Sequence, residues 1–363
     1  MSRLNWRVLA PPAGLVVLAG TWGRSLSSVL PVLIAVVLAA AVLAAVHHAE
    51  VVAHRVGEPL GSLVLAVAVT VIEVGLIVTL MVAGGPGTSS LARDTVFAAA
   101  MITCNGIVGL SLVVAARRYR LVVFNAEGSG AALATVATLS TVCLVLPTFT
   151  TARSGPEFSP SQLAFAALAS LVLYAAFVAT QTVRHRDFFL PVTSTGEVIA
   201  AADEEAHAEP PSTRDAWRSL ALLLVALVSV VGLAKVLSPS IESAVASLGL
   251  PQSFVGVVIA LLVLLPETLA AANAARRNRV QVSFNLALGS AMASIGLTIP
   301  AIAVASIWLQ SPLLLGLGAT QTVLLAITVV VTTLTVVPGR ATRLQGVVHL
   351  VLAAAFVFLA ANP

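Results

Sequence analysis

Apolar stretches long enough to cross a bilayer recur from one end of this chain to the other, and they constrain its fold more than any other feature. A transmembrane helix needs about 20 mostly apolar residues. Only 9% of the 363 residues are charged, against roughly 25% in a soluble domain. A chain so poor in charge cannot cover a water-facing surface, so we expect an all-α membrane protein. The eleven predicted helices are 7–22, 26–54, 59–84, 94–116, 129–150, 161–183, 215–238, 250–276, 281–308, 312–337 and 343–361.

The first of these stretches is short and is interrupted by Pro11 and Pro12. Arg3 and Arg7 precede it, and a basic start before a short apolar run is also typical of a signal peptide. Since no clear small-residue cleavage site follows, we predict a helix that stays in the protein.

The basic residues predict how the chain is oriented. When the connections are assigned alternately to two sides, 15 of the 19 basic residues fall on one side, and the exceptions are Arg24, Arg93, Arg153 and Lys235. Cytoplasmic loops carry such an excess. We therefore expect a cytoplasmic N-terminus and an external C-terminus. The basic residues form no stripe interleaved with aromatic side chains, so nucleic acid is not expected as a partner.

The longest polar stretch, residues 184–214, divides the chain into two halves and contains Asp203, Glu204 and Glu205. It predicts a cytoplasmic linker, either a flexible tether or a loop that gathers cations. The resulting organisation is an extra N-terminal helix, a first repeat, the acidic linker and a second repeat, at residues 1–24, 25–183, 184–214 and 215–363.

A short motif recurs in the two halves. The pattern Glu-x6-Gly-x-Pro begins at Glu50 in the first half and at Glu242 in the second. A lone carboxylate then follows inside the next apolar helix, Glu73 in one half and Glu267 in the other. If each half has five helices, the second enters the membrane from the opposite side. We therefore predict two inverted five-helix repeats, an architecture that places ion sites near the midplane of secondary transporters.

Glu73 and Glu267 are the residues expected to carry the chemistry. A charged side chain at the bilayer centre costs at least about 2.5–3.5 kcal/mol, and no basic residue in the predicted spans is placed to neutralise either one. Each carboxylate must then hold a proton or a cation. Competition between the two for the same oxygens is sufficient for antiport, and hard oxygen ligands suit Ca²⁺ or Na⁺.

Nearby polar residues are predicted to complete this site. Thr70 and Thr268 lie close in sequence to the two glutamates, and Asn105 and Ser290 are polar exceptions in the small-residue helices that follow. Pro266 removes a backbone hydrogen bond just before Glu267, which would free a carbonyl to coordinate an ion. Asp94 and Asn285, at predicted helix starts, are expected to be caps.

Two further carboxylates, Glu50 and Glu242, lie near predicted helix ends. They are expected either to relay protons or cations between the site and water, or to be simple solvent-exposed groups at the interface. No catalytic residue and no resident cofactor or metal is expected, so the protein is predicted not to be an enzyme. The sequence leaves open whether it forms a homo-oligomer.

Two other functions remain open at this point. A gated cation channel also uses acidic groups. Such a channel has a ring of them, however, whereas each half of this chain has one. The cluster His47, His48, Glu50 and His54 suggests an intramembrane metalloenzyme, but its spacing matches no recognised zinc motif, and a hydrated helix end explains it as well.

Several segments resemble the ChaA-type calcium/proton antiporters, in the cation/proton exchanger branch of the calcium:cation antiporter superfamily. The matching segments are Arg55–Gly61, Val69–Glu73, Ala92–Phe97, Asn105–Gly109, Leu265–Thr268, Arg276–Arg279, Asn285–Ser290 and Ile295–Pro300. The resemblance implies that Glu73 and Glu267 are the essential acidic positions and that Asn105 and Ser290 are polar positions around them. It also implies exchange of Ca²⁺ for protons in a bacterial inner membrane, and an acidic stretch between the halves.

The chain departs from the broader exchanger family at the site. That family carries Gly-Asn-Ala before each essential glutamate, where this chain has Thr70-Val-Ile and Leu264-Leu-Pro. A glutamine on a later helix of the family aligns with Ala293. Fewer side-chain oxygens weaken selectivity for a divalent ion, so Na⁺ or K⁺ exchange for protons is expected beside Ca²⁺.

Overall fold

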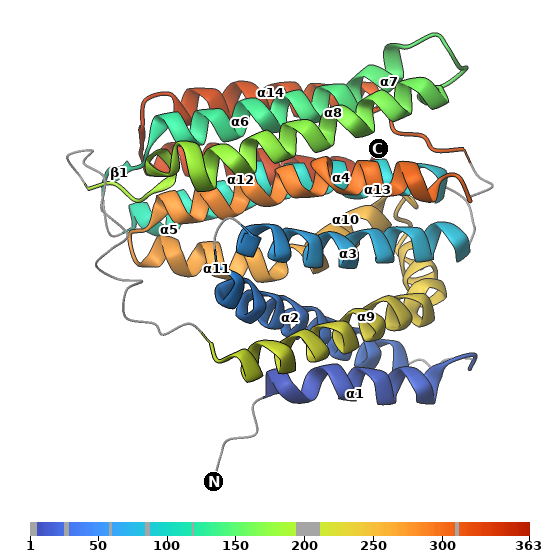
Figure 1. Ribbon diagram of the computed structural model, residues 1–363. Helices are drawn as coiled ribbons and strands as arrows, with labels where there is room; N and C mark the ends of the chain where they lie inside the picture. The colour runs from blue at the N-terminus through green and yellow to red at the C-terminus, as the bar shows by residue number, and fades with distance from the viewer. Residues whose placement is uncertain are drawn as a thin grey trace.

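The computed structural model describes residues 6–24, 29–57, 60–83, 88–117, 120–193, 211–308 and 312–363. Its long helices run roughly parallel to one another across the molecule (Figure 1). Among the described residues, nine helices are long and apolar enough to cross a membrane, or ten if a bent pair is counted as one span. A shorter apolar helix, α1 (Trp6–Thr21), lies beside them. The prediction of about eleven helices is confirmed.

With the bent pair of α10 and α11 counted as one span, the described helices after α1 form five spans on each side of the linker. Because five is an odd number, the second set enters the membrane from the side opposite to the first. The inverted-repeat prediction is therefore confirmed. The first set comprises α2 (Leu30–Val56), α3 (Leu60–Ala83), α4 (Leu91–Met101) with η2 (Ile102–Ile107) and α5 (Val108–Ala116), α6 (Ala126–Ser140) with η3 (Thr141–Val145) and α7 (Leu146–Phe149), and α8 (Pro160–Ala179) with η4 (Thr180–Arg184). The second comprises α9 (Thr213–Ser247), α10 (Phe254–Val263) with α11 (Leu265–Arg276), α12 (Val280–Gly296) with α13 (Thr298–Ala305), α14 (Ala319–Val336) and α15 (Arg343–Ala361).

The repeated Glu-x6-Gly-x-Pro motif marks a helix end in both halves. Gly57 caps α2 with φ of 75°, and Gly249 follows α9 with φ of 68°. Glycine adopts this left-handed conformation without the steric cost that a Cβ brings. Pro251 lies in the turn before α10, and Pro59 lies outside the described residues.

Element boundaries differ most from the predicted ones in the second half. Helix α9 continues through Pro239 to Ser247, so Glu242 lies inside a helix rather than beyond its end. The predicted span 312–337 begins as a helix only at Ala319. Of the predicted linker, residues 194–210 lie outside the described residues, and Asp203, Glu204 and Glu205 are among them.

The connections rich in arginine meet at one end of the molecule, where α1 begins (Figure 1). Two of them pair as short antiparallel strands, β1 (Val122–Val123) with β2 (Arg340–Ala341). The arginine-rich connections therefore lie together at one end of the molecule, as the alternating assignment predicts. Which face of the membrane this end meets remains a prediction.

Helix α1 packs against α2 and α9. Ser229 of α9 donates a hydrogen bond to the Pro11 carbonyl at 3.1 Å. The buried ring of His48, on α2, bridges the Arg7 carbonyl at 3.0 Å and the Ser219 hydroxyl at 3.3 Å. These polar contacts join the N-terminal helix to both repeats.

Candidate functional site

Glu73 lies near the middle of α3 and is almost completely buried, with 2% of its surface exposed. Its Oε2 atom accepts hydrogen bonds from the Ser294 Oγ and the Thr298 Oγ1, each at 3.0 Å. Its Oε1 atom is buried and has no hydrogen-bond partner in the described part of the chain. A buried carboxylate oxygen without a donor is a strong acceptor that a proton or a cation would satisfy.

The two donors come from a break between helices. Ser294 lies on the last turn of α12, and Thr298 is the first residue of α13. The predicted site residue Ser290 lies one turn before Ser294 and is half-buried. Residues four apart share a helix face, so the spacing 290, 294 and 298 is the signal from which Ser294 and Thr298 could have been found.

Glu267 occupies the first turn of a new helix. Helices α10 and α11 are bent by 54° at Leu264, and Pro266 stands beside the bend. The free N–H groups at a helix start favour negative charge. The Glu267 Oε2 atom is buried and, within the described residues, lacks a hydrogen-bond partner. Both predicted carboxylates thus keep one open oxygen.

The bend at Leu264 also accounts for Thr268. The Leu264 carbonyl accepts hydrogen bonds from the Thr268 backbone at 2.9 Å and from its hydroxyl at 2.7 Å. The hydroxyl of Thr268 thus stabilises the start of α11. Because Pro266 has no N–H, the carbonyl of Leu262 loses its usual donor one turn on, in agreement with the predicted effect of this proline.

The structure brings the two glutamates close enough for their charges to interact. The charges of Glu50 and Glu73 both act repulsively on Glu267. Helix α3 contacts α10, α12 and α13, and α11 contacts α12. Elements of both repeats therefore surround the pair. Thr70, one turn before Glu73 on α3, is also buried.

The two predicted relay residues have different surroundings. Glu50 is more than half exposed, and its Oε2 lies 3.8 Å from the Nδ1 of His47. Glu242 is half-buried and accepts a hydrogen bond from Ser238 at 3.2 Å. Of the two, Glu50 is thus the one that is both exposed and within electrostatic range of Glu267.

Asn105, predicted to lie at the site, makes its hydrogen bonds elsewhere. It is fully buried in the π-helical turn η2. Its amide donates to Thr328 at 2.9 Å, and its oxygen lies 3.1 Å from the His349 ring. These partners belong to α14 and α15 rather than to the helices of the two glutamates. The turn itself contacts α11 and α12.

The histidine cluster does not form a metal site. His48 is held by the backbone of Arg7 and by Ser219. In the part of the chain that the structure describes, no three His, Cys, Asp or Glu side chains are grouped so that they could hold a metal ion. These contacts give His48 a structural role between helices.

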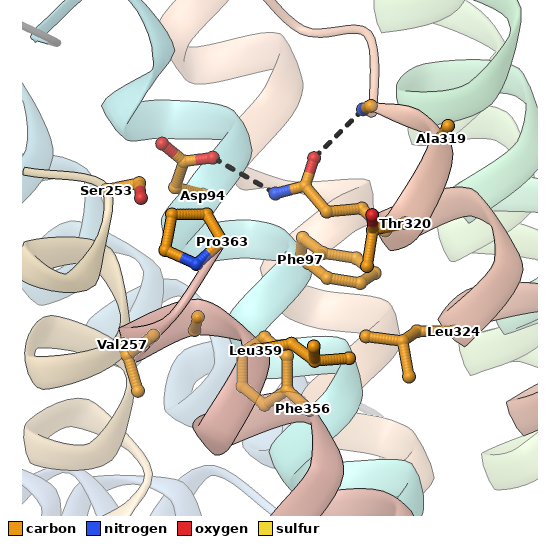
Figure 2. Close-up of a pocket in the computed structure, with 13 residues that line it drawn as sticks. Asp94, Phe97, Ser253, Val257, Ala319, Thr320, Leu324, Phe356, Leu359 and Pro363 are labelled. Atoms are coloured by element: carbon orange, nitrogen blue, oxygen red, sulfur yellow. Dashed lines mark hydrogen bonds between the residues drawn. The ribbon is translucent and has the colours of Figure 1, made fainter. Parts of the chain in front are cut away.

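A cavity of about 220 Å³ lies between α4, α10, α14 and α15, and Asp94, Phe97 and Phe356 are among the residues that line it (Figure 2). Gln321, also in its lining, donates to the Asp94 Oδ1 at 3.5 Å. The buried Asp94 carboxylate lies 2.8 Å from the Arg93 guanidinium and accepts from the Ser90 hydroxyl at 2.9 Å. Its charge is already compensated, so Asp94 does not offer an open carboxylate for a cation. Asp94 lies in the first turn of α4 and is not its N-cap residue, which is Ser90.

The cap prediction is also wrong for Asn285. This residue lies inside α12, whose N-cap is Arg279. Its amide donates to the Phe189 carbonyl at 2.7 Å and its oxygen accepts from Gln281. Asn285 therefore fixes α12 to the segment that follows α8.

Comparison with known proteins agrees with this architecture. The sodium/calcium exchanger protein family matches residues 26–183 and 218–361. The y4hA protein of Sinorhizobium fredii (strain NBRC 101917 / NGR234) is 46% identical over 365 residues, covering 99% of this chain and 96% of its own. The sodium-potassium/proton antiporter ChaA of Escherichia coli (strain K12) is 34% identical over 355 residues, covering 96% and 94%.

Solved structures share the fold at low sequence identity. The structure of native YfkE has a TM-score of 0.71 and 16% identity, with 99% of each chain covered. The crystal structure of the H⁺/Ca²⁺ exchanger CAX has a TM-score of 0.68 and 15% identity, covering 98% of this chain and 91% of its own. With a family match over both repeats, the chain belongs to the sodium/calcium exchanger protein family, within the calcium:cation antiporter superfamily.

Proposed function

We propose that this chain is a secondary active antiporter that exchanges a cation for protons, with Glu73 and Glu267 as the alternating binding groups. The observation that carries the proposal is that each glutamate, on a different repeat, keeps one buried oxygen without a hydrogen-bond partner among the described residues. The family membership and the names of two relatives, a sodium-potassium/proton antiporter and a Ca²⁺/H⁺ antiporter, support it.

Exchange follows from competition at these oxygens. With Ca²⁺ bound, both glutamates are ionised and the charge of the ion balances theirs; with Na⁺ or K⁺ bound, one glutamate is ionised and the other keeps its proton. With the cation gone, two bare carboxylates in mutual repulsion are too costly in a membrane interior, so protons replace it. The hydroxyls of Ser294 and Thr298 occupy Oε2 of Glu73, which leaves Oε1 as the atom that binds a proton or the cation.

The transported cation is proposed to be Ca²⁺ first, with Na⁺ and K⁺ as further substrates. Carboxylate, hydroxyl and carbonyl oxygens are hard ligands that suit all three ions. Ca²⁺ favours six to eight oxygens. The site offers Glu73 and Glu267, with Thr70 one turn before Glu73, Ser290 one turn before Ser294, and the Leu262 carbonyl near the bend. The relative of 34% identity is named for Na⁺ and K⁺, which supports the monovalent alternatives.

The arginine-rich end faces the cytoplasm of a bacterial inner membrane, with the N-terminus on that side. The units are the first repeat at 25–183 and the second at 215–363, joined by the linker at 184–214 and preceded by the helix at 1–24. Lipid surrounds the protein, and no resident cofactor takes part. Glu50 relays ions between water and Glu267.

Reconstituted proteoliposomes test the proposal. Each of Ca²⁺, Na⁺ and K⁺ is added alone, and the internal pH and the cation content are followed together. An antiporter moves protons against the cation in a fixed ratio, and this movement disappears in Glu73→Gln. Glu127→Gln, an exposed carboxylate at the start of α6, is the matched control and should exchange normally. Cation flux without proton counterflow would show a channel instead.

A further inference from the structure

His349 is fully buried in α15, a helix that also presents large apolar side chains such as Val351 and Phe358 to the outside. A polar ring in such a helix is costly unless it is hydrogen-bonded. Its Nδ1 lies 3.1 Å from the Asn105 Oδ1, and its Nε2 lies 3.1 Å from the Thr335 Oγ1. The proposed exchange at the two glutamates gives this ring no role.

The surroundings of Asn105 determine which ring nitrogen carries the proton. The Asn105 Nδ2 donates to the Thr328 Oγ1 at 2.9 Å, and the Thr328 hydroxyl in turn donates to the Met101 sulfur at 3.5 Å. The other end of the amide is therefore its oxygen, which can only accept. With the amide in this orientation, His349 donates from Nδ1 to the Asn105 oxygen.

The second nitrogen is satisfied without a charge on the ring. The Thr335 hydroxyl lies 3.1 Å from Nε2 and 2.9 Å from the Val331 carbonyl. This hydroxyl donates to the Val331 carbonyl in the structure. Rotated about its C–O bond, it can instead donate to Nε2, which in a neutral ring protonated at Nδ1 is an acceptor. A neutral imidazole thus completes the hydrogen bonds of three helices.

The turn that His349 holds borders the helices of the proposed site. Asn105 and Cys104 belong to η2, a π-helical turn within the α4–α5 span. Such turns are uncommon and occur frequently at functional sites. The turn contacts α12, which carries Ser294, and α11, which carries Glu267. His349 and Thr328 bind the same turn from α15 and α14.

We propose that His349 is a positioning residue for exchange: as a neutral imidazole protonated at Nδ1, it fixes the Asn105 amide and with it the π-helical turn beside the carboxylate helices. The role in exchange rests on the proposed function, whereas the protonation of Nδ1 does not. His349 itself touches neither glutamate oxygen in the described contacts. Its effect on transport is transmitted through Asn105.

Two substitutions of similar size separate this role from simple packing. In His349→Asn, the side-chain amide lies near the former Nδ1 and can still donate to Asn105. In His349→Gln, the side-chain amide lies near the former Nε2 and cannot donate to Asn105. Loss of one neutral hydrogen bond changes an equilibrium by roughly three- to tenfold. We expect His349→Ala and His349→Gln to lower exchange by about that factor, and His349→Asn to restore most of it.

Exposed His185→Asn is the control for replacing a histidine and should behave as the unchanged protein. Equal exchange in the Asn and Gln variants, or normal exchange in His349→Ala, overturns the positioning role. If Glu73→Gln still exchanges normally, the proposed function fails instead. The two failures are therefore distinguishable from one set of proteoliposome measurements.

Histidine-selective ¹⁵N NMR of the intact protein tests the assignment without any transport. The spectrum of His349→Asn identifies the His349 signals by their absence. We expect a neutral ring with the proton on Nδ1, both in the unchanged protein and in Glu73→Gln. A ring protonated only at Nε2 would overturn the proposal, whatever the variants do to exchange.

Discussion

Ser294 on α12 donates a hydrogen bond to the Glu73 carboxylate on α3, with 3.0 Å between the serine Oγ and the glutamate Oε2. The two residues belong to different repeats and lie 221 positions apart. One end of the carboxylate is thus fixed by the opposite repeat, while its other oxygen stays open. Any movement of α12 relative to α3 must break this contact or carry Glu73 with it.

Removing the exchangeable proton from either glutamate should stop transport. Glu73→Gln and Glu267→Gln keep the shape of the side chain. Glutamine has neither the exchangeable proton nor the negative charge that binds the cation, so each variant should abolish both fluxes. Asp replacements should be milder because they keep the charge. Neutralising Glu50 or Glu242 should slow exchange or shift its pH dependence rather than stop it. Proteoliposome fluxes, with membrane insertion checked, measure all of these.

The strongest contrary result would be normal exchange in the double variant Glu73→Gln/Glu267→Gln. The two buried carboxylates would then be structural, and the cation site would have to lie elsewhere.

The hydroxyls on Glu73 should tune its competition between protons and cation. Hydrogen bonds to a charged group contribute about 1.5–3 kcal/mol. Without them the ionised carboxylate is less stable, so protons compete better. Ser294→Ala or Thr298→Val should therefore require a roughly ten- to hundredfold higher cation concentration for half-maximal exchange, and should move the exchange profile to more alkaline pH. Thr298→Ser keeps the hydroxyl and should change little; a Thr298→Val profile that matches it would contradict this role.

The Arg93–Asp94 pair should matter for stability rather than for selectivity. Breaking a buried ion pair costs about 3–5 kcal/mol, so Asp94→Asn should lower the thermal unfolding midpoint in detergent. The cations that drive proton flux should stay the same. The more exposed pair Arg153–Glu157 is the comparison, since Glu157→Gln should cost less than about 1 kcal/mol. A change of cation preference in Asp94→Asn would place Asp94 on the ion pathway.

Orientation can be tested with single cysteines. The native Cys104 and Cys143 are buried, so they should label weakly with a membrane-impermeant maleimide. His185→Cys, at the arginine-rich end, should label only from the cytoplasmic side, and Ala152→Cys, at the opposite end, only from outside. Both residues are exposed. The reverse pattern would invert the proposed topology.

The acidic linker should be dispensable for turnover. Charges in water are screened over about 8 Å and hold a cation weakly. Replacing Asp203, Glu204 and Glu205 with Ser should leave the maximal exchange rate nearly intact, with a changed cation or pH dependence at most. Complete loss of exchange at normal expression would make the linker part of the mechanism.

The sequence predicts the spans well because hydrophobic length is a local property that lipid enforces. The burial of Glu73 and the unpaired oxygen of Glu267 also agree with expectation, since each is a lone carboxylate in an apolar stretch. The partners of Asn105 could not be predicted. Thr328 and His349 lie 223 and 244 residues away, and helices that are apolar on all sides give no periodic signal of which face meets which neighbour.

The bend at Leu264 was only partly foreseeable. Pro266 predicts a lost hydrogen bond, but the 54° angle depends on how α10 and α11 pack against other helices. Ser294 and Thr298 were missed for a similar reason, because their common face matters only once α3 lies opposite the break between α12 and α13.

The carboxylate helices of the two repeats are not equivalent, because α3 is described as one continuous helix whereas its counterpart is broken at Leu264. A carboxylate in the middle of a continuous helix moves with the whole span, while one at a break can move with half of it. The states of the protein that are open to the two sides of the membrane are then not equivalent by symmetry, and they differ in free energy. In vesicles of uniform orientation, the concentration of cation giving half-maximal exchange should therefore differ between the two faces, with the maximal rates differing in compensation so that equilibrium is unchanged.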